Sequence, residues 1–334
     1  MLKLGYKASA EQFGPSELLK FAHLAEQLGF DSVFVSDHFQ GWRHTGGHAP
    51  FALSWLGALG ASTSRILMGT SVLTPTFRYH PSLVAQAFGT LGSIFPRRVL
   101  LGVGTGESLN ETPATGLPWP PQAERTARFR ESIELIKLLW RDERVSFQGK
   151  FYQTQNATIY DKPGDAVPIY IAAGGPVIAK FAGEKGDGFI CTSGKKTELY
   201  SETLIPNVNA GLEKVGRATN SIDRMIEMKV SFDEDYQRAY QDTRHWGALA
   251  LSAEEKMNVE DPVEMERLAD ALPAERTAQR WIVSTDAEEH VEKIKPYIDL
   301  GFNHLVFHAP GPDQERFLQL YSQRVIPLLR KRFG

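Results

Sequence analysis

The feature of this sequence that most restricts its fold is an alternation of short apolar runs with amphipathic stretches, which repeats eight times along 334 residues. Short apolar runs bounded by turn residues are typical of buried strands, and the stretches between them carry apolar residues at helical spacing. The predicted strands are residues 2–8, 31–37, 66–73, 99–103, 168–172, 188–192, 226–232 and 304–308. This order favours an α/β fold, a (β/α)₈ TIM barrel with enlarged loops at the C-terminal rim, with an open doubly wound sheet as the alternative.

The segments between the predicted strands give helices and two longer excursions. The predicted helices are residues 16–28, 51–62, 81–94, 124–140, 176–183, 262–272 and 313–330. The first excursion contains Pro113, Pro118, Pro120 and Pro121 and is interpreted as irregular chain, followed later by a small hairpin near 145–152. The second excursion lies between the last two strands. Because no repeat, low-complexity tract or linker is visible, we expect one domain over residues 1–334.

Composition excludes several classes of function. A net charge of -3 argues against a general nucleic-acid or anionic-membrane surface, and the single Cys191 excludes an intrachain disulfide. No apolar run approaches the length of a membrane span and the first residues lack a signal core, so we expect a cytoplasmic protein. His44 and His48 are spaced like a metal pair, but the glycines between them prevent a helix and no third ligand is near. We therefore expect no metal.

The residues that follow the strands should converge on one pocket if the barrel is correct. Asp37 and His38 end the second strand, and Trp42 follows after a glycine. An acid and a histidine beside an aromatic ring indicate proton transfer next to a flat ligand, although a structural strand cap is the alternative. The other strand-end residues are Ser71–Thr76, Gly104–Glu107, Gly174–Gly175, Thr192–Lys195 and Lys229.

Two glycine-rich strand ends point to different ligand contacts. The run Gly102–Glu107 lacks the third glycine of a dinucleotide fingerprint, because Glu107 stands in its place. We expect these glycines to let the backbone approach a flat ligand, with Glu107 projecting as an acid. Gly174 and Gly175 precede Pro176 at a helix start, where free amides make a seat for a phosphate or carboxylate, or simply a tight turn.

Taken together, these motifs resemble the coenzyme F420-dependent glucose-6-phosphate dehydrogenases of the bacterial luciferase-like superfamily. The resemblance runs nearly from end to end of the chain. Its most specific segments are residues 4–11, 35–39, 46–51, 69–78, 102–107, 171–176, 188–195 and 304–310. Two departures are the bulky Val177–Ile178 pair and the composition of the loop at residues 112–122.

The resemblance implies a homodimeric barrel that oxidises glucose 6-phosphate, or a related sugar 6-phosphate, at C1 and passes hydride to C5 of coenzyme F420, an 8-hydroxy-5-deazaflavin. It places His38, Trp42 and Glu107 at the reacting carbons. The implied cofactor-binding residues are Asp37, Ser71, Val72, Thr74, Thr105, Gly106, Asn110, Gly174, Gly175, Val177 and Ile178, with a non-proline cis bond between Ser71 and Val72. The implied phosphate-binding residues are Thr192, Lys195, Lys256 and Arg280.

The residues suit this chemistry. Oxidation of a hemiacetal releases a proton from O1 and requires a proton at N1 of the deazaflavin, so two titratable groups are needed. We expect His38 at O1 and Glu107 toward N1, with the reverse assignment open. Asp37 would orient His38 or meet the cofactor, and Trp42 would shield the reacting pair. The alternatives are an FMN-dependent luciferase-like monooxygenase on the same barrel and a non-catalytic ligand-binding barrel.

Overall fold

Eight parallel strands close into a barrel in the computed structural model, which describes residues 2–334. The ring consists of β1 (Lys3–Ala8), β2 (Ser32–Val35), β3 (Leu67–Thr70), β4 (Val99–Val103), β7 (Ile169–Ala172), β8 (Gly188–Thr192), β9 (Asp223–Phe232) and β11 (His304–His308). Pairing of β8 with β9 and of β11 with β1 completes the ring. A ninth strand, β10 (Ile282–Ser284), pairs with the last residues of β9. The closed ring confirms the predicted barrel and excludes the open doubly wound sheet.

The barrel interior is packed with side chains and is not a channel. The interior cluster consists of Phe34, Leu100, Tyr170, Ile190, Met225 and Val306, each from a different strand. A larger apolar layer fills the space between the strands and the surrounding helices. Strands that are buried on both faces require nearly continuous apolar runs, which is why the eight strands were recognisable in the sequence. Because the interior is filled, a ligand is expected only at a rim, and the carboxyl-terminal rim carries the functional loops.

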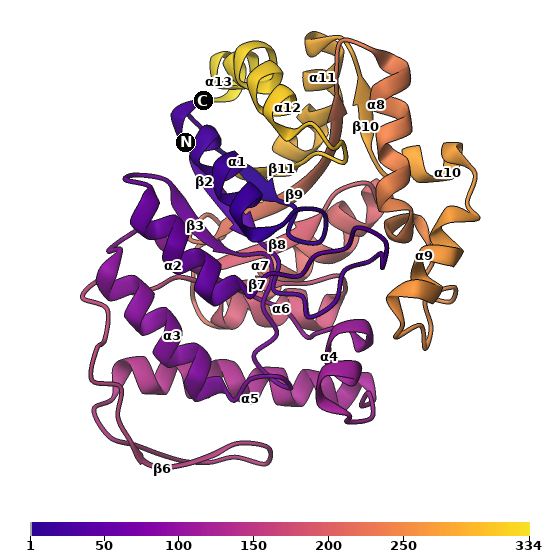
Figure 1. The fold of residues 1–334 in the computed structure, drawn as a ribbon. Helices are drawn as coiled ribbons and strands as arrows, with labels where there is room; N and C mark the ends of the chain where they lie inside the picture. The colour runs from indigo at the N-terminus through magenta and orange to yellow at the C-terminus, as the bar shows by residue number, and fades with distance from the viewer. Residues whose placement is uncertain (1) are drawn as a thin grey trace.

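Helices surround the barrel, as Figure 1 shows. Their bounds are α1 (Pro15–Gln27), α2 (Ala52–Ser62), α3 (Pro81–Ile94), α5 (Gln122–Arg141), α6 (Pro176–Lys185), α7 (Ile205–Lys214), α8 (Tyr236–Asp242), α11 (Ala287–Asp299), α12 (Gln314–Leu320) and α13 (Ile326–Phe333). Pro15, Pro81 and Pro176 stand at the first turns of α1, α3 and α6, where a missing backbone N–H costs nothing. The helix starts that follow β-strands are therefore fixed locally by sequence.

The two excursions differ in part from the prediction. The expectation of irregular chain from Pro113 onward is wrong for its first part, because α4 (Ser108–Thr115) includes that proline. A helix this short loses a single backbone hydrogen bond to Pro113 and then ends at Gly116, which takes the left-handed conformation at φ 68°. The predicted hairpin is present and longer than expected, as β5 (Val145–Gln148) and β6 (Gln153–Ala157).

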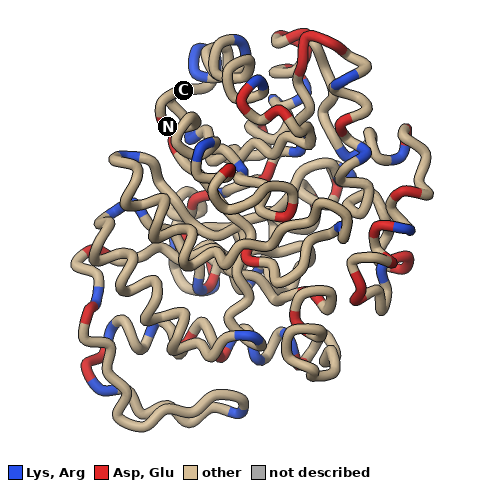
Figure 2. The backbone as a smooth tube through the Cα atoms, viewed as in Figure 1, with Lys and Arg blue, Asp and Glu red and all other residues tan. Residues whose placement is uncertain are grey.

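The second excursion adds short helices beside the carboxyl-terminal rim. It contains a 3₁₀ segment at Thr243–Ala250, then α9 (Pro262–Asp270) and α10 (Ala274–Ala278). Charged residues of both signs are spread over the outer helices and loops, in keeping with the small net charge of -3 (Figure 2). Within the described part of the chain, no helix combines the length and the apolar character needed to cross a membrane.

Candidate active site

A cavity of about 390 Å³ opens at the carboxyl-terminal ends of the barrel strands. Most of the residues singled out in the sequence lie in its wall. They are Asp37, His38, Trp42, Ser71, Val72, Thr74, Thr105, Gly106, Glu107, Asn110, Gly174, Thr192 and Arg280. The volume is within the range of small-molecule sites, which are typically a few hundred to about 1,000 Å³. The predicted convergence of strand ends on one pocket is therefore what the structure shows.

Five of the singled-out residues lie outside the cavity wall. Gly175, Val177 and Ile178 form the start of α6, where no side chain caps the free backbone amides. Val177 is 54% exposed, and Ile178 packs partly against the core. Lys195 and Lys256 lie near the wall without forming it, and the Lys256 ammonium lies 5.2 Å from the centroid of the Trp42 ring.

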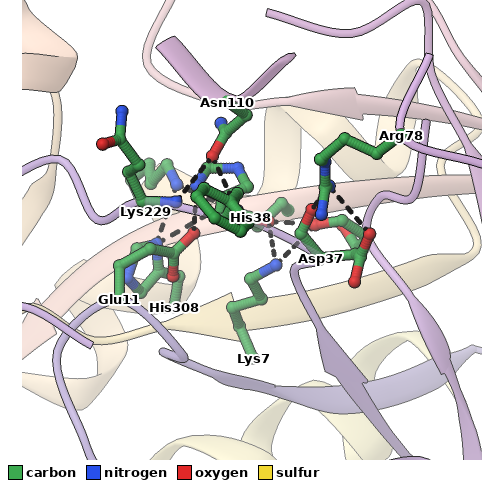
Figure 3. Close-up of polar contacts among 12 residues, drawn as sticks. Lys7, Glu11, Asp37, His38, Arg78, Asn110, Lys229 and His308 are labelled. Carbon is green, nitrogen blue, oxygen red and sulfur yellow. Dashed lines mark hydrogen bonds and ion pairs between the residues drawn. The ribbon is translucent and has the colours of Figure 1, made fainter. Parts of the chain in front are cut away.

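Asp37 is held by residues that the sequence reading did not consider. Its Oδ2 accepts hydrogen bonds from Arg78 Nη2 at 2.9 Å and from the Tyr79 hydroxyl at 2.8 Å, as Figure 3 shows for Arg78. Arg78 also contacts Glu111 at 3.2 Å. The expectation that Asp37 orients His38 is wrong, because its bonded oxygen is committed to Arg78 and Tyr79. The other oxygen, Oδ1, is buried and has no partner among the described residues, so it remains available to a ligand.

Glu11 is the carboxylate beside His38. Its Oε1 lies 3.0 Å from His38 Nδ1, a distance typical of an ion pair, although the two groups are poorly aligned for a hydrogen bond (Figure 3). Burial raises the pKa of Glu11, but the nearby His38 and Lys7 more than offset it, and the pKa lies below its ordinary value. An ionised carboxylate at Nδ1 leaves His38 Nε2 to accept a proton. Because Glu11 follows β1, the strand-end rule could have found it.

Asn110 supports the loop that carries His38. Its Oδ1 accepts hydrogen bonds from the backbone amides of Phe39 at 2.9 Å and Gln40 at 3.1 Å. The Trp42 ring then lies edge-on to His38, with ring centroids 5.8 Å apart. Asn110 thus holds the loop after β2 at Phe39 and Gln40, and the loop presents the imidazole and the indole together at the cavity.

Glu107 stands at the start of α4, exposed and facing the cavity. The negative charge of Glu107 acts on Lys256. Burial lowers the pKa of Lys256, and Glu107 offsets part of that shift, so the pKa stays below its ordinary value. The two side chains thus belong to one electrostatic environment on the side of the cavity that carries Trp42. The Glu107 side chain therefore projects at the cavity as expected, and its role as an acid stays a prediction.

The end of the cavity at Arg280, where the resemblance predicts a phosphate and which we call the phosphate end, collects positive charge. Thr192 Oγ1 and Arg280 Nε are buried and without partners among the described residues, while Arg280 Nη1 donates to the Gly194 carbonyl. Burial lowers the pKa of Lys195, and repulsion from Arg280, Lys256 and Lys229 lowers it further. Cations that repel one another beside unpartnered donors make a seat for an anion such as phosphate.

A group of four charged or titratable side chains, which we call the floor cluster, was largely missed. It consists of Lys7, Glu227, Lys229 and His308, all of which line the cavity. They come from β1, β9 and β11, with Glu227 in the middle of β9 and His308 at the end of β11. Only Lys229 had been noted as a strand-end residue. The signal in the sequence was the alternation in β9, which places Glu227 and Lys229 on the same face of the strand.

The glycines after β4 let the neighbouring loop pack closely, and Gly104 and Gly106 also line the cavity, so their approach to a flat ligand stays a prediction. A Cβ at Gly104 would lie 2.8 Å from Val72 Cγ2, and one at Gly106 would lie 2.9 Å from Thr74 Cγ2. The bond between Ser71 and Val72 is the expected non-proline cis peptide. The two loops therefore pack tightly against each other to form one wall of the cavity.

Gly106→Ala should destabilise the protein and disturb this wall. Gly106 has φ 85°, and an added methyl group would meet Thr74 and Trp119. We expect the free energy of unfolding to fall by about 1–3 kcal/mol, as measured by urea denaturation. Gly57→Ala is the matched control, because Gly57 lies inside α2 with open space around it and should gain roughly 0.5–1 kcal/mol. Equal stability of the two variants would contradict this role of Gly106.

Comparison with known proteins adds independent information. The family model described as luciferase-like monooxygenase matches residues 2–304. A protein of Nakamurella multipartita named F420-dependent glucose-6-phosphate dehydrogenase is 62% identical over 333 residues, covering 100% of this chain and 98% of that protein. One with the same name from Beutenbergia cavernae is 64% identical over 332 residues, covering 99% of this chain and 98% of its own length.

A solved structure is also similar over nearly the whole chain. It is an F420-dependent secondary alcohol dehydrogenase in complex with an F420-acetone adduct, and it superimposes with a TM-score of 0.92 at 32% sequence identity. The match covers 97% of this chain and 98% of the other. The fold is therefore shared, over nearly the whole chain, with an F420-dependent enzyme.

Proposed function

We propose that this chain oxidises glucose 6-phosphate at C1 to 6-phosphogluconolactone, with coenzyme F420 as the hydride acceptor. The reason is that the chain belongs to the F420-dependent glucose-6-phosphate dehydrogenases of the luciferase-like monooxygenase family. The observation that carries this proposal is one cavity whose wall holds His38 and Glu107 together with Thr192 and Arg280, beside the cation Lys195. An FMN-dependent monooxygenase would share the barrel, but the relatives of 62% and 64% identity are named as dehydrogenases. A non-catalytic carrier would not need the Glu11–His38 pair.

The residues of the cavity fit the cofactor. Asp37 Oδ1 is a buried polar atom without a partner among the described residues, as expected where a flat heterocycle supplies the missing hydrogen bond. The uncapped amides at the start of α6 suit an anionic tail at the rim. Asp37, Thr74 and Gly174 would hold the cofactor together with the other residues named above. When bound, the deazaflavin supplies a hydride acceptor at C5.

His38 would act as the general base at O1 of the sugar. Its Nε2 is free to take the proton because Glu11 occupies the side of Nδ1. Positive charge then appears on the imidazole, and the ionised Glu11 carboxylate stabilises it at close range. Glu11 is thus a positioning residue that acts through His38.

Glu107 would hold the second proton on the opposite side of the transfer, toward N1 of the cofactor. Trp42 lies against His38 and beneath Lys256, so its ring covers the reacting carbons and excludes water. Thr192, Lys195, Lys256 and Arg280 would bind the phosphate and orient the sugar for transfer. We also propose a homodimer and a cytoplasmic location, and one domain over residues 1–334. The resemblance and the absence of a linker support these three assignments.

The purified protein should bleach the visible absorbance of F420 when glucose 6-phosphate is added, and should not reduce NADP or FMN. The failed dinucleotide fingerprint at Glu107 and the family relationship give this expectation. A spectrophotometric assay with each acceptor measures it, with glucose in place of its 6-phosphate as the control. Strong NADP reduction without F420 turnover would contradict the proposed function.

A further inference from the structure

The floor cluster contains donors that none of the roles above uses. Lys229 and His308 are 4% and 2% exposed, and Glu227 lies between Lys7 and Lys229. Glu227 is ionised, because burial opposes its charge but Lys229 and Lys7 hold its pKa well below the ordinary value. Lys229 Nζ donates to Glu227 Oε1 and lies 2.8 Å from His308 Nδ1 (Figure 3).

The shorter of two contacts decides the tautomer of His308, because Nδ1 lies 2.8 Å from Lys229 Nζ and 3.4 Å from Glu227 Oε1. An ammonium group has only hydrogens to offer, so Nδ1 of His308 must accept, and a neutral ring then carries its hydrogen on Nε2. Burial, together with the charge of Lys229, lowers the pKa of His308 to about 4, so the ring is neutral near pH 7. The Nε2–H group is buried and has no partner among the described residues.

The Lys229 ammonium provides a second free hydrogen-bond donor, in addition to the Nε2–H group of His308. Its ammonium has three hydrogens, of which Glu227 and His308 receive two. Glu227 Oε2 in turn has only long contacts, 3.4 Å each to Lys7 Nζ and to Ser71 Oγ. Buried donors without acceptors cost about 1–3 kcal/mol each, so a ligand that presents oxygen atoms here would be bound favourably.

The floor cluster lies between the two ends of the cavity. On one side, Lys229 repels Lys195 and is itself affected by Arg280, both of the phosphate end. On the other side, the charge of Lys7 acts on Glu11, the partner of His38. Trp246 lines the same stretch of wall, with its ring 4.4 Å from that of His308. An indole surface beside polar groups suits the mixed apolar and hydroxyl faces of a pyranose.

We propose that the floor cluster binds the ring hydroxyls of the sugar and selects among sugar 6-phosphates. Lys229 and His308 donate to hydroxyl oxygens on C2 to C4, and Glu227 accepts a hydroxyl hydrogen. A pyranose whose phosphate lies at Arg280 and whose C1 lies at His38 places these hydroxyls between the two. The inference rests on the proposed function, and it identifies the residues that would make the site specific for one sugar.

The test compares Lys229→Met and His308→Phe with the parent enzyme. Both replacements keep much of the side-chain volume, and Lys7 remains near Glu227 when Lys229 is lost. We measure kcat/KM for glucose 6-phosphate and for its 2-, 3- and 4-deoxy analogues. The parent should disfavour at least one analogue by roughly 10- to 100-fold, the loss expected for a hydrogen bond to a charged or buried group. In each variant this ratio should fall to about threefold or less.

His290→Phe is the matched control, because His290 is a buried histidine that packs against Phe232 and Tyr321 and does not line the cavity. It should lower stability without changing the ratios. Calorimetry should also show weaker binding of glucose 6-phosphate to cofactor-free Lys229→Met.

Several results would overturn the assignment. The assignment would be wrong if the ratio of kcat/KM between glucose 6-phosphate and its deoxy analogues were unchanged in both variants. Weaker F420 binding with unchanged ratios would also overturn it, and would place the donors at the cofactor. An active parent that treats all deoxy analogues alike would overturn only this inference. A parent that reduces no F420 with any sugar phosphate would overturn the proposed function itself, and this inference with it.

Discussion

Replacing His38 by alanine should lower kcat for F420 reduction by about 10²- to 10⁴-fold, the usual contribution of a positioned base. Glu11 lies 3.0 Å from Nδ1 and would stabilise the charge that His38 gains when it takes the proton from O1. Since a base must be deprotonated to act, the variant should lose the acidic limb of the pH profile of kcat/KM. Steady-state rates across the pH range measure both effects, and F420 fluorescence titration should show cofactor binding retained.

Glu107→Gln is the matched variant for the opposite proton. It should lower turnover by a similar factor of about 10²- to 10⁴-fold and remove the basic limb, because it keeps the size of the side chain and loses only its acidity. If His38→Ala kept its acidic limb and Glu107→Gln lost it, the two roles would have to be exchanged. Parental rates in both variants would show that Asp37 and His38 are a structural strand end.

Lys195→Ala and Arg280→Ala should each raise KM for glucose 6-phosphate by roughly 10- to 100-fold, with a smaller effect on kcat. The buried Arg280 Nε has no partner among residues 2–334, and Lys195 is repelled by Arg280, Lys256 and Lys229, so both cations gain when a phosphate dianion binds. Initial rates at varied substrate concentration separate KM from kcat. Unphosphorylated glucose should be a poor substrate for the parent and for both variants.

Lys196→Ala is the control for charge, because Lys196 is the sequence neighbour of Lys195 and likewise exposed, but it is not among the cations that repel Lys195. It should keep the parental KM. Arg280 also donates to the Gly194 carbonyl, so a loss seen only in Arg280→Ala would reflect the fold of that loop. If Lys195→Ala, Lys256→Ala and Arg280→Ala all kept the parental KM, these residues would be ordinary surface charge.

Much of the fold could be predicted because its determinants are local. Strands buried on both faces require apolar runs, and turn residues end them, so all eight barrel strands were visible in sequence. The start of α6 at Pro176 was predicted because proline suits a first turn. The helix at Ser108–Thr115 was missed because Pro113 argues locally against it. Its persistence reflects tertiary packing, since Leu109 joins a small apolar cluster with Ala248 and Leu251.

The sequence by itself determined which residues reach the cavity, because the carboxyl-terminal ends of parallel strands meet at one rim of a barrel. Only the tertiary structure decided how those residues pair. Asp37 is the sequence neighbour of His38, yet it contacts Arg78 and Tyr79, while Glu11 from the end of the adjacent strand lies at Nδ1. The floor cluster likewise joins Lys7, Glu227 and His308 from strands far apart in the chain. Adjacent side chains in extended chain diverge, whereas paired strands bring distant residues together, so partners are set by strand pairing and not by sequence distance.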